Sequence, residues 1–188
     1  MLTHYCFKEV LPKEFCDGFL NVARELDSKE AEVFKEGDDV VLSEIRNNRV
    51  AWLANDELSG ILELYVDIAN EKAGWDFSLT SFEVPQVSFY GKGQFYDWHV
   101  DTGVEKQSDP YFRKLAISIT LNDEFKGGDF QVQNFVHPQA PNRFKTVKEM
   151  RRQGSIIVFP SFIFHRVTKV KEGERSAMTC WFRGEKFS

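Results

Sequence analysis

Short strand-like segments separated by glycine and proline fill the second half of the chain, and they limit its possible folds more than any other feature. Aromatic and β-branched residues alternate or run together for a few positions and then meet a turn. We expect strands at 84–90, 95–101, 115–121, 130–135, 155–159, 164–170 and 175–182. Many short strands with this punctuation predict a mainly β fold, a sandwich or a barrel.

The first part of the chain predicts two helices instead. One is expected to open at Pro12 and to place four apolar residues at helical spacing: Phe15, Phe19, Val22 and Leu26. Another is expected between a cap at Asn55 and a stop at Gly74, with an apolar stripe of Leu58, Ile61, Leu62, Tyr65, Ile68 and Ala69. Short strands at 40–42 and 50–53 are expected between them. Both helices are interpreted as packing against the sheet.

Composition excludes several classes of protein. With 188 residues, of which 42% are hydrophobic, the chain is long enough for one domain with its own core and is too apolar to be disordered. A net charge of −5 argues against a nucleic-acid-binding surface. The sequence shows neither a signal peptide nor an apolar run of membrane-spanning length. Cys6, Cys16 and Cys180 are odd in number and irregularly spaced, which argues against a disulfide framework and favours a reducing cytoplasm.

His99 and Asp101 form the central chemical motif. Residues i and i+2 of a strand point to the same face, so an imidazole and a carboxylate are expected to converge on one point. A third ligand must come from elsewhere, and His165, at the start of a later strand, is the best placed of the remaining histidines. Two histidines and one carboxylate leave three metal positions open, the arrangement suited to non-haem Fe(II) and oxygen. Alone, a His-x-Asp pair is also common as a hydrogen-bonded histidine at a strand end.

Arg175 strengthens the metal interpretation. It follows a glycine turn, begins an apolar strand, and shares one face with Ala177, Thr179 and Trp181. An arginine on a buried face needs an anionic partner, and a bound carboxylate held by two hydrogen bonds would supply one. The alternative is an arginine at a strand end with its guanidinium in solvent.

Several motifs surround these residues, at 90–101, 121–122, 127–130, 159–161, 165–170 and 173–181. Together they resemble the 2-oxoglutarate- and Fe(II)-dependent dioxygenases, in particular the prolyl 4-hydroxylases and the bacterial and phage hydroxylases of the prolyl/lysyl type. They occur in the family's order and spacing across about residues 82–184. The resemblance implies a double-stranded β-helix, a jelly-roll (cupin-like) core at 82–184, with residues 1–81 as helical support in a single domain of 1–188.

The same resemblance assigns roles to individual residues. His99, Asp101 and His165 would bind iron, and Arg175 would pair with the distal carboxylate of 2-oxoglutarate. Five further positions would line the cosubstrate pocket, namely Tyr90, Thr179, Thr120, Trp181 and Phe130. Thr120 stands where animal oxygen-sensing hydroxylases carry a longer tyrosine, which puts the second anchor of that carboxylate in doubt. Trp181 and Phe130 are interpreted equally well as ordinary aromatic core.

The implied reaction is hydroxylation of an unactivated C–H bond with O2, in which 2-oxoglutarate is converted to succinate and CO2, and ascorbate serves as reductant. The leading hypothesis for the substrate is a prolyl residue in a peptide or protein, and Tyr96 is expected to face it. A small-molecule or free amino-acid hydroxylase remains an alternative, as does a non-catalytic jelly-roll binding module. A nucleic-acid demethylase is disfavoured because position 181 is tryptophan, not a second arginine.

Two further expectations concern loops. The polar stretch 102–113 is interpreted as a substrate lid, since long loops in a small domain are often functional. The stretch 136–152 is equally long unless 146–147 forms a strand. Arg46 and Arg49, near a predicted turn, are interpreted either as substrate contacts or as a solvated charge pair. A small hydroxylase of this kind fits the cytoplasm of a bacterium, or of a host cell if the protein is viral.

Overall fold

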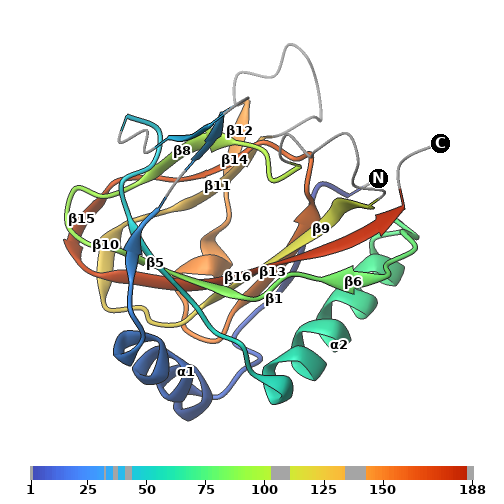
Figure 1. The fold of residues 1–188 in the computed structure, drawn as a ribbon, viewed down its shortest axis with the longest axis horizontal. Helices are drawn as coiled ribbons and strands as arrows, with labels where there is room; N and C mark the ends of the chain where they lie inside the picture. Colours follow the sequence, from blue (N-terminus) through green and yellow to red (C-terminus); the bar gives the residue numbers. More distant parts are fainter. Residues whose placement is uncertain are drawn as a thin grey trace.

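A large β-sheet and a smaller one face each other, and two helices pack behind the large sheet (Figure 1). The computed structural model describes residues 2–31, 33–35, 38–40, 44–102, 111–133 and 143–185. Its helices are α1 (Lys13–Glu25), α2 (Asp56–Lys72) and a short 3-10 helix, η1 (Lys148–Arg151). The prediction of a mainly β fold is confirmed, and two facing sheets are consistent with a jelly-roll core.

The large sheet has eight strands, and its order is β1-β13-β9-β16-β7-β5-β2, with β6 also paired to β16. Its strands are β1 (Tyr5–Phe7), β2 (Lys29–Glu30), β5 (Arg49–Trp52), β6 (Ser81–Phe82), β7 (Gln86–Tyr90), β9 (Tyr111–Thr120), β13 (Ile156–Pro160) and β16 (Arg175–Glu185). All its pairings are antiparallel. Three of these strands, β1, β2 and β5, come from the first 81 residues, which were expected to supply helical support; β5 corresponds to the short strand expected at 50–53, and β1 and β2 were not expected.

The smaller sheet has four strands in the order β12-β11-β14-β8. They are β8 (Tyr96–His99), β11 (Phe130–Gln133), β12 (Phe144–Thr146) and β14 (His165–Val167). Two-stranded ribbons complete the fold: β10 (Phe125–Gly127) with β15 (Val170–Gly173), and β3 (Val33–Lys35) with β4 (Asp38–Val40). No helix among the described residues is long and apolar enough to cross a membrane.

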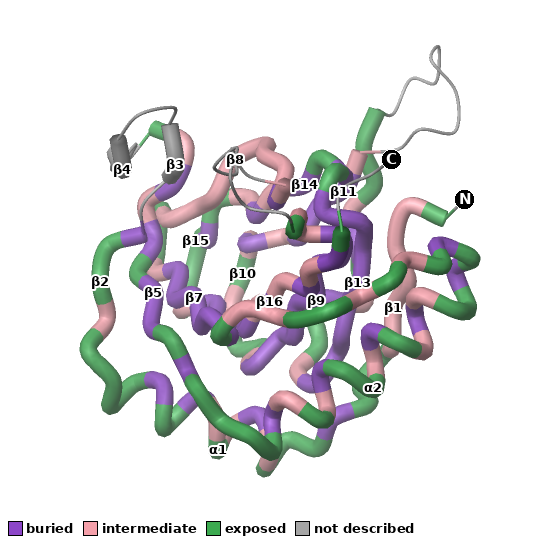
Figure 2. The backbone as a smooth tube through the Cα atoms, turned by 45° about the vertical axis from the view of Figure 1, so that its right-hand side comes forward, coloured by how far each residue is buried: buried purple, intermediate pink, exposed green. Residues whose placement is uncertain are grey.

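Side chains alternate between the two faces along each strand of the large sheet, and an apolar cluster lies on each face. In β9, Leu115, Ile117 and Ile119 belong to the cluster that packs against the helices, whereas Ala116 belongs to the cluster between the two sheets. Figure 2 shows buried residues concentrated in the central strands of the large sheet. Because successive side chains point to opposite faces, a sheet covered on both sides needs apolar residues in both registers.

The two helices differ in how well local sequence describes them. The side-chain oxygen of Asn55 accepts a hydrogen bond from the Leu58 amide at 2.9 Å, so α2 begins at its predicted cap. The predicted face of α1 is wrong in part, since Val22 and Leu26 are exposed. The residues of α1 that are buried are Cys16, Leu20 and Ala23. The buried face of α1 is therefore shifted around the helix from the predicted stripe, which included neither Leu20 nor the smaller residues Cys16 and Ala23.

The predicted strand at 164–170 is divided in the structure. Its first part is β14, which pairs with β11 and β8, and its end belongs to β15, which pairs with β10. A change of partner therefore splits one apolar run into two strands. Residue 146 ends strand β12, so the stretch 136–152 is not one continuous loop. Residues 41–42 and 134–135 of two expected strands, residues 103–110 of the expected lid and residues 136–142 lie outside the described residues.

Candidate metal centre and its cavity

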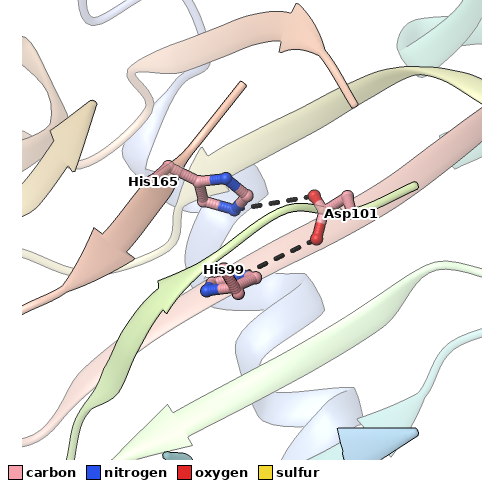
Figure 3. A group of neighbouring side chains, drawn as sticks. All are labelled: His99, Asp101 and His165. Atoms are coloured by element: carbon pink, nitrogen blue, oxygen red, sulfur yellow. Dashed lines mark ion pairs between the residues drawn. The ribbon is translucent and has the colours of Figure 1, made fainter. Parts of the chain in front are cut away.

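The three residues predicted to bind a metal converge between the two sheets (Figure 3). His99 ends β8, Asp101 follows it, and His165 opens β14 directly opposite His99. Nε2 of His99 lies 3.7 Å from Oδ1 of Asp101, and Nε2 of His165 lies 3.6 Å from Oδ2. The ligand atoms of all three residues lie within 4.8 Å of one another. Two strands and the turn after β8 thus present three ligand atoms to one point.

Backbone carbonyl groups fix the tautomer of both histidines. Nδ1 of His99 lies 2.7 Å from the carbonyl oxygen of Asp97, and Nδ1 of His165 lies 2.9 Å from that of Ile163. A carbonyl oxygen only accepts, so each Nδ1 carries the proton and each Nε2 presents a lone pair to the centre. Burial, followed by the nearby His165, holds the pKa of His99 well below its usual value and keeps its ring neutral. A neutral imidazole is the form that binds metals.

Asp101 completes a set of atoms that fits a divalent cation. Its side chain is 7% exposed, and its Oδ2 has no hydrogen-bond partner among the described residues. Both contacts to the histidines exceed hydrogen-bond length. A buried carboxylate without a partner is strongly unfavourable, and a metal ion would satisfy it. Two imidazoles and one carboxylate suit Fe(II) with open positions for further ligands.

A cavity of about 840 Å3 opens beside the triad. Its walls come from both sheets and include every metal-site residue predicted from the sequence, together with Arg175. Tyr90, Thr179, Phe130 and Trp181 also line it, as expected from the resemblance. Because these side chains come from β7, β16 and β11, the cavity exists only when the two sheets face each other.

Arg175 is the unusual residue of this cavity. It is 1% exposed, and its Nε and Nη2 atoms have no hydrogen-bond partner among the described residues. Its guanidinium carbon lies 5.6 Å from the centre of the Tyr90 ring, a distance at which a cation–π contact operates. Burial lowers the pKa of this guanidinium, with Tyr90 and Asp129 acting in the opposite direction. A buried cation with free donors fits a carboxylate ligand.

Thr120 is the one predicted pocket residue that the structure does not bring to the cavity. It is fully buried, and its hydroxyl donates a hydrogen bond to the carbonyl oxygen of Met150 at 2.9 Å. That carbonyl belongs to η1, which packs beneath β9 and β11. Thr120 therefore ties η1 to the large sheet, and its hydroxyl is already engaged.

Arg46 and Tyr96 are cavity residues that the sequence placed only loosely. Arg46 is 7% exposed, donates to Asn48 at 2.7 Å and to Gln86 at 2.9 Å, and lies 4.6 Å from the Tyr96 ring. The Tyr96 ring in turn stacks on His99, with ring centres 3.4 Å apart and an interplanar angle of 9°. The interpretation of Arg46 as a solvated charge is wrong, whereas Arg49 is exposed.

Arg113 is a third arginine of the cavity, and sequence reasoning missed it. It pairs with Glu83, and its guanidinium carbon lies 4.0 Å from the Trp181 ring centre. A signal was available, because Arg113 precedes an apolar run in the same way as Arg175 does. The ion pair of Arg113 and Glu83 therefore places a guanidinium against Trp181, which lines the cavity.

Comparison with known proteins agrees with this geometry. A family model described as the 2OG-Fe(II) oxygenase superfamily matches residues 85–183. A PKHD-type hydroxylase of Hyphomonas neptunium is 30% identical over 105 residues, which cover 54% of this chain and 43% of that protein. The match therefore spans less than half of that relative.

Solved structures share the fold at low identity. The viral collagen prolyl hydroxylase of Paramecium bursaria Chlorella virus-1 has 20% identity over 97% of both chains and a TM-score of 0.71. A prolyl hydroxylase of Trichoplax adhaerens, solved with a peptide of hypoxia inducible factor, has 18% identity over 96% of this chain and 83% of its own, with a TM-score of 0.74. The family model covers more than half of the sequence, including the triad and Arg175, and this chain therefore belongs to the 2OG-Fe(II) oxygenase superfamily.

Proposed function

We propose that this protein is an Fe(II)- and 2-oxoglutarate-dependent hydroxylase that acts on a peptide or protein, with a prolyl residue as its target. One observation carries the proposal: the three-ligand site lines the same cavity as the buried guanidinium of Arg175, whose Nε and Nη2 atoms have no hydrogen-bond partner among the described residues. A metal site alone would fit many functions. A second site for a carboxylate, within the same enclosure, fits a dicarboxylate cosubstrate that binds the metal at one end.

Each residue has a separable task in this mechanism. His99, Asp101 and His165 hold the ion on one side and leave its other positions open. When bound, Fe(II) with 2-oxoglutarate and O2 supplies the oxidising power for C–H hydroxylation, with release of succinate and CO2. Arg175 orients the cosubstrate through its distal carboxylate. The apolar walls at Phe130 and Trp181 exclude water from the reacting atoms.

The outer part of the cavity supports a peptide substrate. Trp52, Val84 and Phe164 line it and are 48%, 49% and 45% exposed, so apolar surface continues from the cavity to the outside. Arg46 also lines the cavity and carries donors of the kind that a peptide carbonyl accepts. A peptide-bound prolyl hydroxylase among the structural relatives agrees with this substrate class.

A free amino acid is the second candidate substrate, and Arg46 favours it. Among the described residues, the side-chain hydrogen bonds of this buried guanidinium go to the neutral oxygens of Asn48, Gln86 and Ser88. A free carboxylate would give Arg46 a charged partner that a peptide carbonyl does not. Parallel assays with proline-containing peptides and with free amino acids, read by mass for one added oxygen atom, separate the two candidates.

Turnover and its dependence on Arg175 test the proposal. The protein with Fe(II), 2-oxoglutarate and a proline-containing peptide, with and without ascorbate, is expected to form succinate in step with hydroxylated peptide. Arg175→Met should raise the KM for 2-oxoglutarate about 30-fold or more, since loss of a buried charge pair removes at least 2 kcal/mol. Its metal affinity should not change.

Two results would contradict the proposal. Metal binding without turnover on either class of substrate would favour a non-catalytic binding module. An Arg175→Met variant that loses its metal but keeps its KM for 2-oxoglutarate would remove the assigned role of Arg175. Arg24→Met is the matched control, because Arg24 pairs with Glu174 on the exposed surface.

A further inference from the structure

Strand β8 contains a bulge next to its metal ligand. In the pairing with β14, His99 lies opposite His165 and Tyr96 lies opposite Val167. Two residues of β8, Asp97 and Trp98, thus face the single residue Arg166. Side chains three positions apart in a regular strand point to opposite faces. Because of the bulge, Tyr96 and His99 both face the cavity and stack on each other.

The guanidinium of Arg166 contacts both bulged residues. Its Nη1 lies 3.4 Å from Oδ1 of Asp97, and its carbon lies 4.8 Å from the centre of the Trp98 ring. Its Nε donates to Oε1 of Gln131 on β11 at 2.8 Å, and the Phe144 ring of β12 lies 5.6 Å away. One side chain therefore joins all four strands of the smaller sheet. Since Arg166 is not among the cavity-lining residues, its action on the centre is indirect.

Asp97 connects this cluster to the metal ligand. Its carbonyl oxygen accepts the hydrogen bond from Nδ1 of His99 at 2.7 Å. Its amide donates to the carbonyl oxygen of Ile45 at 2.8 Å, and its carboxylate accepts from the Trp98 amide at 2.9 Å. The peptide group that orients the imidazole is thus held by its neighbours on both sides. Partners of this kind set the ring orientation of a ligating histidine.

We propose that Arg166 is a positioning residue for the metal centre: it holds the bulge of β8 so that the Asp97 carbonyl keeps His99 directed at the metal. The inference rests on the proposed metal triad. It assigns to an arginine outside the cavity a part in metal affinity. Loss of a partner that orients a metal ligand typically lowers metal affinity about 10- to 100-fold.

An ordinary surface ion pair is the competing explanation, and it predicts a different result. Arg166 is 28% exposed and Asp97 is 50% exposed, and ion pairs of this exposure contribute little to stability. If the pair were only that, its loss would change global stability slightly and leave metal affinity unchanged. Metal affinity of the folded protein therefore separates the two explanations.

Arg166→Met tests the inference, because methionine keeps an apolar stem between the two rings and loses the hydrogen bonds. We expect parent protein and the control Arg24→Met to bind one Co(II) with equal affinity, measured by titration of the visible spectrum in the absence of 2-oxoglutarate. Arg166→Met should bind Co(II) about 10-fold more weakly or worse while its circular dichroism remains that of the parent. Equal affinity in Arg166→Met would overturn the inference. A parent that binds no Co(II) would contradict the metal centre itself.

A double-mutant cycle tests the route through Asp97. Asp97→Ala alone is expected to lower Co(II) affinity, and the double variant with Arg166→Met should be no weaker than the worse single variant. Residues that act through one network show such non-additive effects. Losses that simply add would show that Arg166 acts independently of Asp97 and would overturn the proposed route.

Discussion

Asp101 and Arg175 carry opposite charges in the walls of one cavity, and each has a buried polar atom without a hydrogen-bond partner among the described residues. An unpaired buried charge destabilises a fold by several kcal/mol. The protein tolerates incompletely paired charges at these two residues, where the proposed metal and the proposed cosubstrate carboxylate would pair with them. Function and stability are therefore opposed at these two residues.

Asp101→Asn makes this opposition measurable. The variant should be at least as stable as the parent without metal, because a neutral amide replaces a buried carboxylate. Its Co(II) affinity should fall more than about 100-fold, since a ligand lost outright has a larger effect than a lost orienting partner. Thermal unfolding of the metal-free proteins and Co(II) titration are the measurements. Asp67→Asn, at an exposed site on α2, is the control; a less stable Asp101→Asn that still binds metal would disprove the argument.

The triad could be predicted from the sequence because each of its residues lies in a pattern that a short segment of the chain contains. His99 and Asp101 are two residues apart, and His165 opens a strand that an apolar run predicts. For Arg46 the sequence left two alternatives open, because its segment reaches the cavity through a bridge to Tyr96, which lies far along the chain. Thr120 shows the opposite difficulty. Resemblance transfers a position, but the hydroxyl bonds a carbonyl in η1 that no motif describes.

At the scale of elements, helix α2 contributes to the stability of the fold but lies away from the metal centre. Helix α2 begins at Asn55, whose side chain accepts from the Leu58 amide, and it packs on the face of the large sheet that is turned away from the cavity. A cap satisfies one of the amide groups that the first helical turn leaves free. Changes at this cap should act on the helix and leave the metal centre alone.

Asn55→Ala is therefore expected to lower the free energy of unfolding by about 1 kcal/mol and to leave Co(II) affinity unchanged. Asn55→Asp keeps an acceptor at the cap and should retain most of the stability. Urea denaturation of the metal-free proteins gives the first quantity and Co(II) titration the second. A cap variant with altered metal affinity would show that α2 and the cavity are coupled through the sheet.

Strand patterns predicted most elements but not where a strand changes partner or bulges. The run 164–170 has one continuous apolar pattern, yet β14 and β15 pair with different strands. The bulge in β8 is hidden in the same way, because Tyr96 and His99 look out of phase until β14 is placed beside them. Pairing between distant segments decides both features, and a local period does not contain it.

At the scale of the molecule, the large sheet joins the two parts of the chain. Strand β1 pairs with β13, and β5 pairs with β7, so residues before position 82 form part of the same sheet as the cavity strands. The cavity itself includes Arg46, Val50 and Trp52 from that part. We propose that the chain folds as one domain, in which the first 81 residues supply one side of the site as well as helices.

His4, next to strand β1, is expected to make the stability of the protein depend on pH. It precedes β1, and burial, followed by Lys145 of β12, lowers its pKa to about 4, while Glu149 of η1 acts in the opposite direction. The ordinary value is 6.5, so between these two values the unfolded chain binds more protons than the folded protein. Stability contributed by neutral His4 is thus complete above pH 6.5 and is lost as the pH falls toward 4.

We therefore expect the free energy of unfolding of the metal-free protein to fall with pH across this window, and more steeply in the parent than in His4→Gln. The difference in slope should approach one proton per molecule at most. Denaturation midpoints between pH 4 and 7, taken with an unchanged denaturant m value, measure it. His99 keeps part of the slope in both proteins, so only the difference reports on His4. Identical slopes would mean that His4 is as accessible to protons in the folded protein as in the unfolded chain.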